Sequence, residues 1–337
     1  MERTKIARRE LLAFAGALSL SPVAMNAQTP SPVRTAAGPD VRRAELYGLL
    51  GDLPDRHRPV SGRLRSETVR DGYILETWDL DLNGMETVPA YVARPRNASG
   101  RRPAVVFNHS HGGGYGIGRT EFIDGREYLQ PEPYARALTD RGYVALCIDH
   151  WIFGERSHTS ELDMVKACLW RGQVLWGLMV YDSLKAVDWL VARDDVDPAR
   201  LATIGMSMGS SMAQWLGALD QRIGTVVDIC CLVDYHTLLE QRELGRHGIY
   251  YYVPSLLRHF TAAQINALIA PRPHLSIVGN LDRLTPREGV DIIDRELTRI
   301  YTELGQPDHW QIRRYDVEHQ ETPEARVEAL AFLERHL

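Results

Sequence analysis

Hydrophobic and polar positions follow two patterns along the chain, and the change comes near residue 100. Between residues 64 and 94, apolar and polar side chains alternate, as in strands with one face in solvent. The alternation predicts strands over 64–70, 73–82 and 85–94. Asn83-Gly84 suits the positive φ of a hairpin turn between the last two. We expect these strands to be antiparallel and to lie at one edge of a larger sheet.

Short apolar runs alternate with amphipathic segments from residue 104 to the C-terminus. This alternation predicts an α/β fold: a mostly parallel central sheet, joined by right-handed crossovers, with helices on both faces and antiparallel N-terminal strands. The expected strands are 104–108, 143–148, 201–205, 225–230, 274–279 and 309–315. The expected helices are 41–50, 132–141, 173–192, 207–219, 287–304 and 321–336.

Composition and charge narrow the function classes. The 337 residues are 44% hydrophobic and 25% charged, which is ordinary for a globular protein, and the net charge of −5 gives no reason to expect a nucleic-acid partner. The four cysteines show no zinc-binding spacing. Cys230 and Cys231 lie in an apolar run and are interpreted as core residues, whereas a Cys147–Cys168 disulfide is left open.

The N-terminal 27 residues have the features of an export signal. A basic start containing Arg8-Arg9 precedes an apolar run over 11–20, which is too short to span a bilayer. The paired arginines resemble a twin-arginine signal, so we expect a periplasmic or secreted protein with no membrane anchor after cleavage. The alternative is an amphipathic N-terminal segment. A linker and the short helix fill 28–62, and a catalytic domain is expected over 63–337.

The sequence Gly205-Met206-Ser207-Met208-Gly209 is the motif around which the candidate chemistry is organised. A Gly-x-Ser-x-Gly motif between a strand and a helix predicts a nucleophile elbow, in which a tight turn exposes the serine hydroxyl. Ser207 is therefore the candidate nucleophile. The backbone N–H of Met208 is a candidate donor to an oxyanion.

A serine nucleophile needs a base, and the base needs an orienting carboxylate. Asp282 follows the expected strand 274–279, and His319 follows the expected strand 309–315. The order serine, acid, histidine is that of α/β-hydrolases. We therefore predict a Ser207–Asp282–His319 triad, with Asp234 as the reserve acid.

The glycine-rich loop 108–114 follows the first parallel strand and supplies the second oxyanion donor, predicted to be the backbone N–H of His111 or Gly112. Two rival interpretations use the same region. His109 and His111 would bind a metal, or residues 113–120 would form a phosphate loop in which Arg119 replaces the usual lysine. The triad hypothesis needs no metal and no organic cofactor.

Taken together, these motifs resemble the α/β-hydrolase superfamily, in the branch of dienelactone-hydrolase-like proteins and acetyl xylan esterases. The resemblance covers about residues 64–337 and implies a serine carboxylesterase. One departure is Ser207, because dienelactone hydrolases proper use cysteine. The segments that carry the resemblance are 88–95, 103–113, Asp149 with 153–156, 205–209 and 269–275.

Specificity residues are expected beside the elbow. Glu155 and Arg156 would form an ion pair that shapes the pocket, or would bind a polar substrate. An insertion over 232–262, which includes Tyr235, would form a lid. The sequence favours a secreted carboxylesterase for a small-molecule or carbohydrate ester, such as an acetyl or aryl ester. The alternatives are a prolyl-oligopeptidase-like peptidase and an inactive binding protein.

Overall fold

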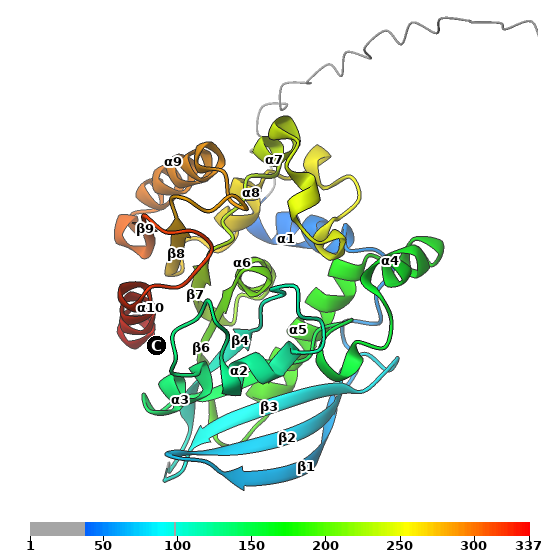
Figure 1. Ribbon diagram of the computed structural model, residues 1–337, viewed down its shortest axis with the longest axis vertical. Helices are drawn as coiled ribbons and strands as arrows, with labels where there is room; N and C mark the ends of the chain where they lie inside the picture. The colour runs from blue at the N-terminus through cyan, green and yellow to red at the C-terminus, as the bar shows by residue number, and fades with distance from the viewer. Residues whose placement is uncertain (1–37, 98) are drawn as a thin grey trace, which may run out of the picture. The chain divides into compact units, whose positions relative to one another are not determined.

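A nine-stranded mixed sheet forms the centre of the computed structural model, which describes residues 38–97 and 99–337 (Figure 1). The predicted export signal and the start of the linker lie outside these residues. The strand order is β1-β2-β3-β5-β4-β6-β7-β8-β9. The strands are β1 (Ser61–Val69), β2 (Tyr73–Asp81), β3 (Val88–Pro95), β4 (Arg102–Asn108), β5 (Val144–Ile148), β6 (Val196–Met206), β7 (Ile223–Ile229), β8 (His274–Gly279) and β9 (Trp310–Tyr315).

The predicted antiparallel edge is confirmed. β1, β2 and β3 pair antiparallel in sequence, β3 pairs antiparallel with β5, and the remaining neighbours are parallel. Gly84 has the positive φ expected of the turn, 71°. β3 begins at Val88 rather than at 85, because the Asn83 side chain accepts hydrogen bonds from the N–H groups of Met85 (2.8 Å) and Glu86 (3.0 Å). Those two amides are thereby held in the turn and not in the sheet.

Two helical layers cover the sheet, as predicted from the alternation. Val105 and Phe107 of β4 pack with α3 and α10, whereas Ala104 and Val106 pack on the opposite face with α5 and α6. The helices are α1 (Pro39–Gly48), α2 (Glu121–Asp124), α3 (Tyr134–Thr139), α4 (Glu161–Trp170), α5 (Leu175–Val191), α6 (Met208–Leu219), α7 (Tyr235–Gln241), α8 (Ala262–Ala267), α9 (Arg287–Glu303) and α10 (Pro323–His336). No helix in the described part of the chain is long and apolar enough to cross a membrane.

Helix α4 was not expected from the sequence. Its hydrophobic side chains do not mark one face, because Leu169 and Trp170 are exposed and Cys168 is its one buried residue. The helix begins instead at a local signal, the Ser160 side chain, which accepts a hydrogen bond from the N–H of Asp163 (3.2 Å).

The four cysteines are free and buried. Cys147 of β5 belongs to the core layer that contains α3 and α10, whereas Cys168 of α4 belongs to the layer on the other side of the sheet. The sheet therefore separates the two thiols, and the pairing left open by the sequence does not form.

Candidate active site

The turn between β6 and α6 has the backbone geometry of a nucleophile elbow. Ser207 lies at φ 59° and ψ −119°, a conformation that costs a non-glycine residue of order 1–3 kcal/mol. Its N–H donates to the carbonyl of Ile229 at the end of β7 (2.9 Å), which fixes the turn against the neighbouring strand. The Ser207 residue is half-buried. A strained serine at this strand end is therefore accessible for chemistry.

Both glycines of the motif are required by close backbone approach. A Cβ on Gly209 would lie 1.9 Å from the carbonyl oxygen of Asn108, and one on Gly205 would lie 2.4 Å from the carbonyl oxygen of Gly209. The start of α6 consequently lies directly against the end of β4. Met208 is the first residue of α6, so its N–H has no acceptor within the helix and is free to serve as an oxyanion donor.

Asp282 and His319 meet at the ends of adjacent strands. Nδ1 of His319 donates to Oδ2 of Asp282 (2.7 Å), and Oδ1 of Asp282 accepts from the N–H of Leu284 (2.8 Å). The loops after β8 and β9 are joined by the bond from the N–H of Leu281 to the carbonyl of Val317 (3.1 Å). The Asp282 carboxylate is buried, whereas 23% of the His319 side chain is exposed. This pairing leaves Nε2 of His319 for a proton transfer.

Asp234, the reserve acid of the sequence analysis, has a structural role as a helix cap. It caps α7, where its Oδ2 accepts from the N–H of Thr237 (2.9 Å) and from the Thr237 hydroxyl (2.9 Å). His319 is paired with Asp282 and not with this residue.

Cys230 is a residue beside the site that sequence reasoning assigned to the core. Its Sγ lies within 4.8 Å of a carboxylate oxygen of Asp282 and of a ring nitrogen of His319. The Cys230 thiol donates to the carbonyl of Gln320 (3.6 Å). Burial raises the pKa of the thiol, so the sulfur stays protonated and packs behind the acid–histidine pair. The sequence signal that could have placed Cys230 near the site is its position directly after β7, the strand beside β6 in the sheet.

The loop after β4 turns at two glycines, Gly112 (φ 50°) and Gly113 (φ 70°). The His111 ring is half-buried against Tyr115, with ring centroids 4.7 Å apart, and it also contacts Phe153. Burial lowers the pKa of His111, which keeps the ring neutral. The oxyanion roles of Met208, His111 and Gly112 stay predictions.

The metal interpretation of this loop is not supported by the contacts of His109. Its ring is fully buried, with Nδ1 3.0 Å from the carbonyl of Ser110 and Nε2 accepting from the N–H of His150 (3.2 Å). Both ring nitrogens are therefore engaged. Burial lowers the pKa of His109 to about 4, so it is neutral at physiological pH.

The phosphate-loop interpretation fails at Arg119. This side chain is buried and forms ion pairs with Asp149 and Glu155. Its guanidinium is thus held inside the protein and does not face an incoming phosphate group.

Glu155 and Arg156 do not pair with each other. Glu155 binds Arg65 (2.8 Å) as well as Arg119, and Arg156 binds Glu86 (2.6 Å) and Asp182 (2.9 Å). The expected ion pair is replaced by contacts to the N-terminal strands and to α5. Arg156 is only 3% exposed, and its ion pairs hold the loop after β5 in place, whereas Glu155 is an exposed residue that binds Arg65 and Arg119.

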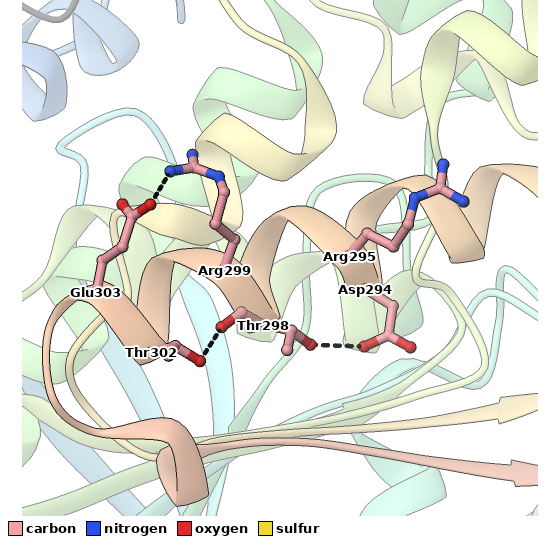
Figure 2. A pocket seen from close by; sticks show the side chains of 6 residues that line it. All are labelled: Asp294, Arg295, Thr298, Arg299, Thr302 and Glu303. Carbon is pink, nitrogen blue, oxygen red and sulfur yellow. Dashed lines mark hydrogen bonds and ion pairs between the residues drawn. The ribbon is translucent and has the colours of Figure 1, made fainter.

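Two hollows of the surface differ in character. Tyr235 lines a largely apolar cavity of about 370 Å³ within the insertion, together with Leu238, Leu239, Leu244, Tyr251, Tyr252, Val253, Ser255, Leu256, Leu257 and Arg258. The other, over the second half of α9, is lined by polar side chains that bind one another, including Arg299 to Glu303 (2.6 Å) (Figure 2). Because α9 runs from the end of β8 back towards the start of β9, that hollow lies away from Ser207.

A buried carboxylate binds the loop 108–114, here called the oxyanion loop after its predicted role. Oε1 of Glu121 accepts from the N–H of Ser110 (2.9 Å), and its Oε2 accepts from the Ser110 hydroxyl, which also contacts the Tyr128 hydroxyl. Nη1 of Arg126 lies 3.5 Å from Oε2 of Glu121. Despite these partners, burial raises the pKa of Glu121 to about 6.

This raised pKa predicts a specific pH dependence of stability. Between pH 4.5 and 6 the folded state holds a proton that the unfolded state releases, so the free energy of unfolding falls as pH rises through this window, by about 2 kcal/mol. Gln does not titrate in this range, so the Glu121→Gln variant lacks this pH-dependent contribution to the free energy of unfolding. The unfolding free energy of the variant minus that of wild type should rise by about 2 kcal/mol between pH 4.5 and 7 in urea titrations. Glu127→Gln, at an exposed position nearby, is the control, and a flat difference for Glu121→Gln would contradict the prediction.

Comparison with known proteins agrees with the fold. YtaP of Bacillus subtilis (strain 168), provisionally named a hydrolase, is 51% identical over 296 residues, covering 88% of this chain and 99% of YtaP. A structure from Bacteroides fragilis NCTC 9343, provisionally named an acetyl xylan esterase, has a TM-score of 0.64 and 21% identity, and the match covers 82% of this chain and 74% of that one. A glucuronoyl esterase from Solibacter usitatus has a TM-score of 0.63 and 14% identity, over 87% and 91% of the two chains.

The sequence model of the abhydrolase family matches residues 41–334. This match spans most of the chain, including the positions of Ser207, Asp282 and His319. The chain therefore belongs to the abhydrolase family of α/β-hydrolases, and it has the fold of known carbohydrate esterases.

Proposed function

We propose that this protein is a serine carboxylesterase that hydrolyses its substrate through an acyl-enzyme. The observation that carries the proposal is the strained Ser207 at the end of β6, on the same edge of the sheet as the hydrogen-bonded pair of Asp282 and His319. A binding protein would have no need to maintain a costly serine conformation beside an oriented histidine.

In the proposed reaction, His319 Nε2 takes the Ser207 proton as Oγ attacks the ester carbonyl. The Asp282 carboxylate orients the ring and stabilises the imidazolium. The N–H groups of Met208 and of the loop after β4, at His111 or Gly112, hold the oxyanion. The imidazolium then protonates the leaving alcohol, and His319 activates the water that cleaves the acyl-enzyme and regenerates Ser207.

An acylated carbohydrate is the substrate class that we propose. The neighbouring structures named above are called acetyl xylan and glucuronoyl esterases, which supports a sugar ester. The insertion adds three tyrosines around an apolar cavity, and aromatic rings suit either a sugar face or an aryl ester. The peptidase alternative has no specific observation in its favour.

The proposal is tested by assaying the purified protein against p-nitrophenyl acetate, longer-chain p-nitrophenyl esters, acetylated xylan and a peptide p-nitroanilide. We expect hydrolysis of the esters, release of acetate from xylan and covalent labelling by a fluorophosphonate probe. A folded protein that hydrolyses none of the esters and resists the probe would instead be a binding protein. Cleavage of the anilide alone would favour a peptidase.

A further inference from the structure

The segment 126–134, here called the brace, contacts the oxyanion loop on one side. The Tyr128 hydroxyl contacts the Ser110 hydroxyl, which donates to the buried Glu121. Nη2 of Arg126 donates to the carbonyl of Gly112 (3.0 Å). The packing is tight, because a Cβ on Gly112 would lie 2.2 Å from the Tyr128 hydroxyl oxygen. The brace therefore holds the Ser110 side chain and the Gly112 carbonyl of this loop in place.

The same brace contacts the loop that follows β9 and carries His319. The carbonyl of Tyr128 accepts from the N–H of Glu321 (2.9 Å), and the Gln130 side chain donates to the carbonyl of Glu321 (2.7 Å). The Glu321 carboxylate accepts from the N–H of Gln130 (3.0 Å) and from the Tyr134 hydroxyl (2.5 Å). Glu321 lies two residues after His319 and is 4% exposed. The histidine loop is thus bound to the brace by four hydrogen bonds.

Tyr128 is the one residue of the brace that binds both loops, with its hydroxyl on the oxyanion side and its carbonyl on the histidine side. The Glu121 carboxylate, the Ser110 and Tyr128 hydroxyls and the Tyr128 backbone form one continuous network, buried at Glu121 and Ser110 and half-buried at Tyr128. Networks of this kind hold their members in one arrangement when every member is satisfied. The two loops follow different strands, β4 and β9, and the brace is hydrogen-bonded to both of them.

We propose that Tyr128 and Glu121 are positioning residues that set the oxyanion loop in register with the His319 loop. The proposal rests on the proposed esterase function for its consequence in catalysis. Neither side chain takes a proton from the substrate; both act through Ser110 and through the backbone. Misplacing an oxyanion donor weakens transition-state binding more than substrate binding, so kcat changes and KM does not.

The test compares Tyr128→Phe with Tyr47→Phe. Tyr128→Phe keeps the ring and the carbonyl bonded to Glu321 but removes the hydroxyl. The Tyr47 hydroxyl is buried without a partner among the described residues, so its removal is a matched control. With p-nitrophenyl acetate, we expect Tyr128→Phe to lower kcat about tenfold, the effect of one lost hydrogen bond, with little change in KM. Tyr47→Phe should leave both unchanged.

A double-mutant cycle tests whether Tyr128 acts through Ser110. Ser110→Ala removes the hydroxyl between Tyr128 and Glu121, so the double variant Ser110→Ala/Tyr128→Phe should be no slower than the slower single variant. Multiplying effects would mean that the two hydroxyls act independently, and this would overturn the proposed connection.

Hydrogen–deuterium exchange provides a readout that does not depend on activity. In Tyr128→Phe, peptides that contain 108–114 and 318–322 should both exchange faster, whereas a purely local role would affect only the brace itself and would overturn the proposal. If wild type has no esterase activity and the two loops still loosen together, the positioning role stands and the proposed function fails. Normal kcat with unchanged exchange in both loops rejects the role of Tyr128.

Discussion

Ser207→Ala is expected to lower kcat for p-nitrophenyl acetate by about 10⁴-fold or more, as in other enzymes of this mechanism. The substitution keeps Cβ and so keeps the turn between β6 and α6, but it removes the hydroxyl that forms the acyl-enzyme. Labelling by a fluorophosphonate should disappear in parallel. Steady-state kinetics together with gel detection of the probe measure both effects.

Ser183→Ala is the matched control for this experiment. Ser183 is a buried serine of α5, and its hydroxyl donates to the carbonyl of Met179 (3.0 Å) within the helix. This variant should retain normal kcat and full labelling. If Ser207→Ala kept its esterase activity while its thermal unfolding matched that of wild type, another residue would be the nucleophile.

Asp282→Asn is the second large effect that we expect, a loss of about 10³- to 10⁴-fold in kcat. The carboxylate now accepts the proton on Nδ1 of His319. In the Asp282→Asn variant, an amide whose NH₂ group faces Nδ1 favours the opposite tautomer of His319, in which the ring proton is on Nε2. In that tautomer Nε2 cannot accept the proton of Ser207. KM should change little, because the geometry of the pocket is kept.

The variant Asp234→Asn tests which of the two candidate carboxylates, Asp282 or Asp234, orients His319. Asn caps a helix as well as Asp does, so the hydrogen bond from the N–H of Thr237 is preserved and activity should be normal. The assignment of Asp282 would be wrong if the losses were exchanged, with Asp234→Asn inactive and Asp282→Asn active. Measuring both variants with the same ester and comparing their thermal midpoints decides between the two.

Much of the fold could be predicted because its signals are local. Continuous apolar runs marked β4 to β9, alternation marked β2 and β3, and Asn83-Gly84 marked their turn. Helix α4 was missed because its exposed Leu169 and Trp170 break the amphipathic pattern. The pairing of Cys147 with Cys168 could not be judged from spacing, since it depended on which face of the sheet each one reaches.

In the candidate site, too, the features that depend on local sequence could be predicted, and those that depend on distant contacts could not. Gly-x-Ser-x-Gly, with an acid and a histidine after later strands, predicted the elbow and the Asp282–His319 pair, because parallel strands bring their carboxyl ends to one edge. Glu155 and Arg156, which follow a strand end, were expected to form an ion pair with each other or to bind a polar substrate. Their partners come from β1 and from the turn before β3, among other elements, and only the folded chain brings those charges near.

The sequence by itself determined the order of most elements, the serine turn and the positions of the candidate acid and base, because each is encoded within a few consecutive residues. The tertiary structure alone decided which long-range contacts support them. The place of Cys230 beside the acid–histidine pair and the brace that joins the loop after β4 to the histidine loop bring together segments far apart in the chain. The contact of Glu121 with Ser110 spans eleven positions and depends on the fold of the loop between them. Such contacts depend on packing and burial, and no local pattern of residues records them.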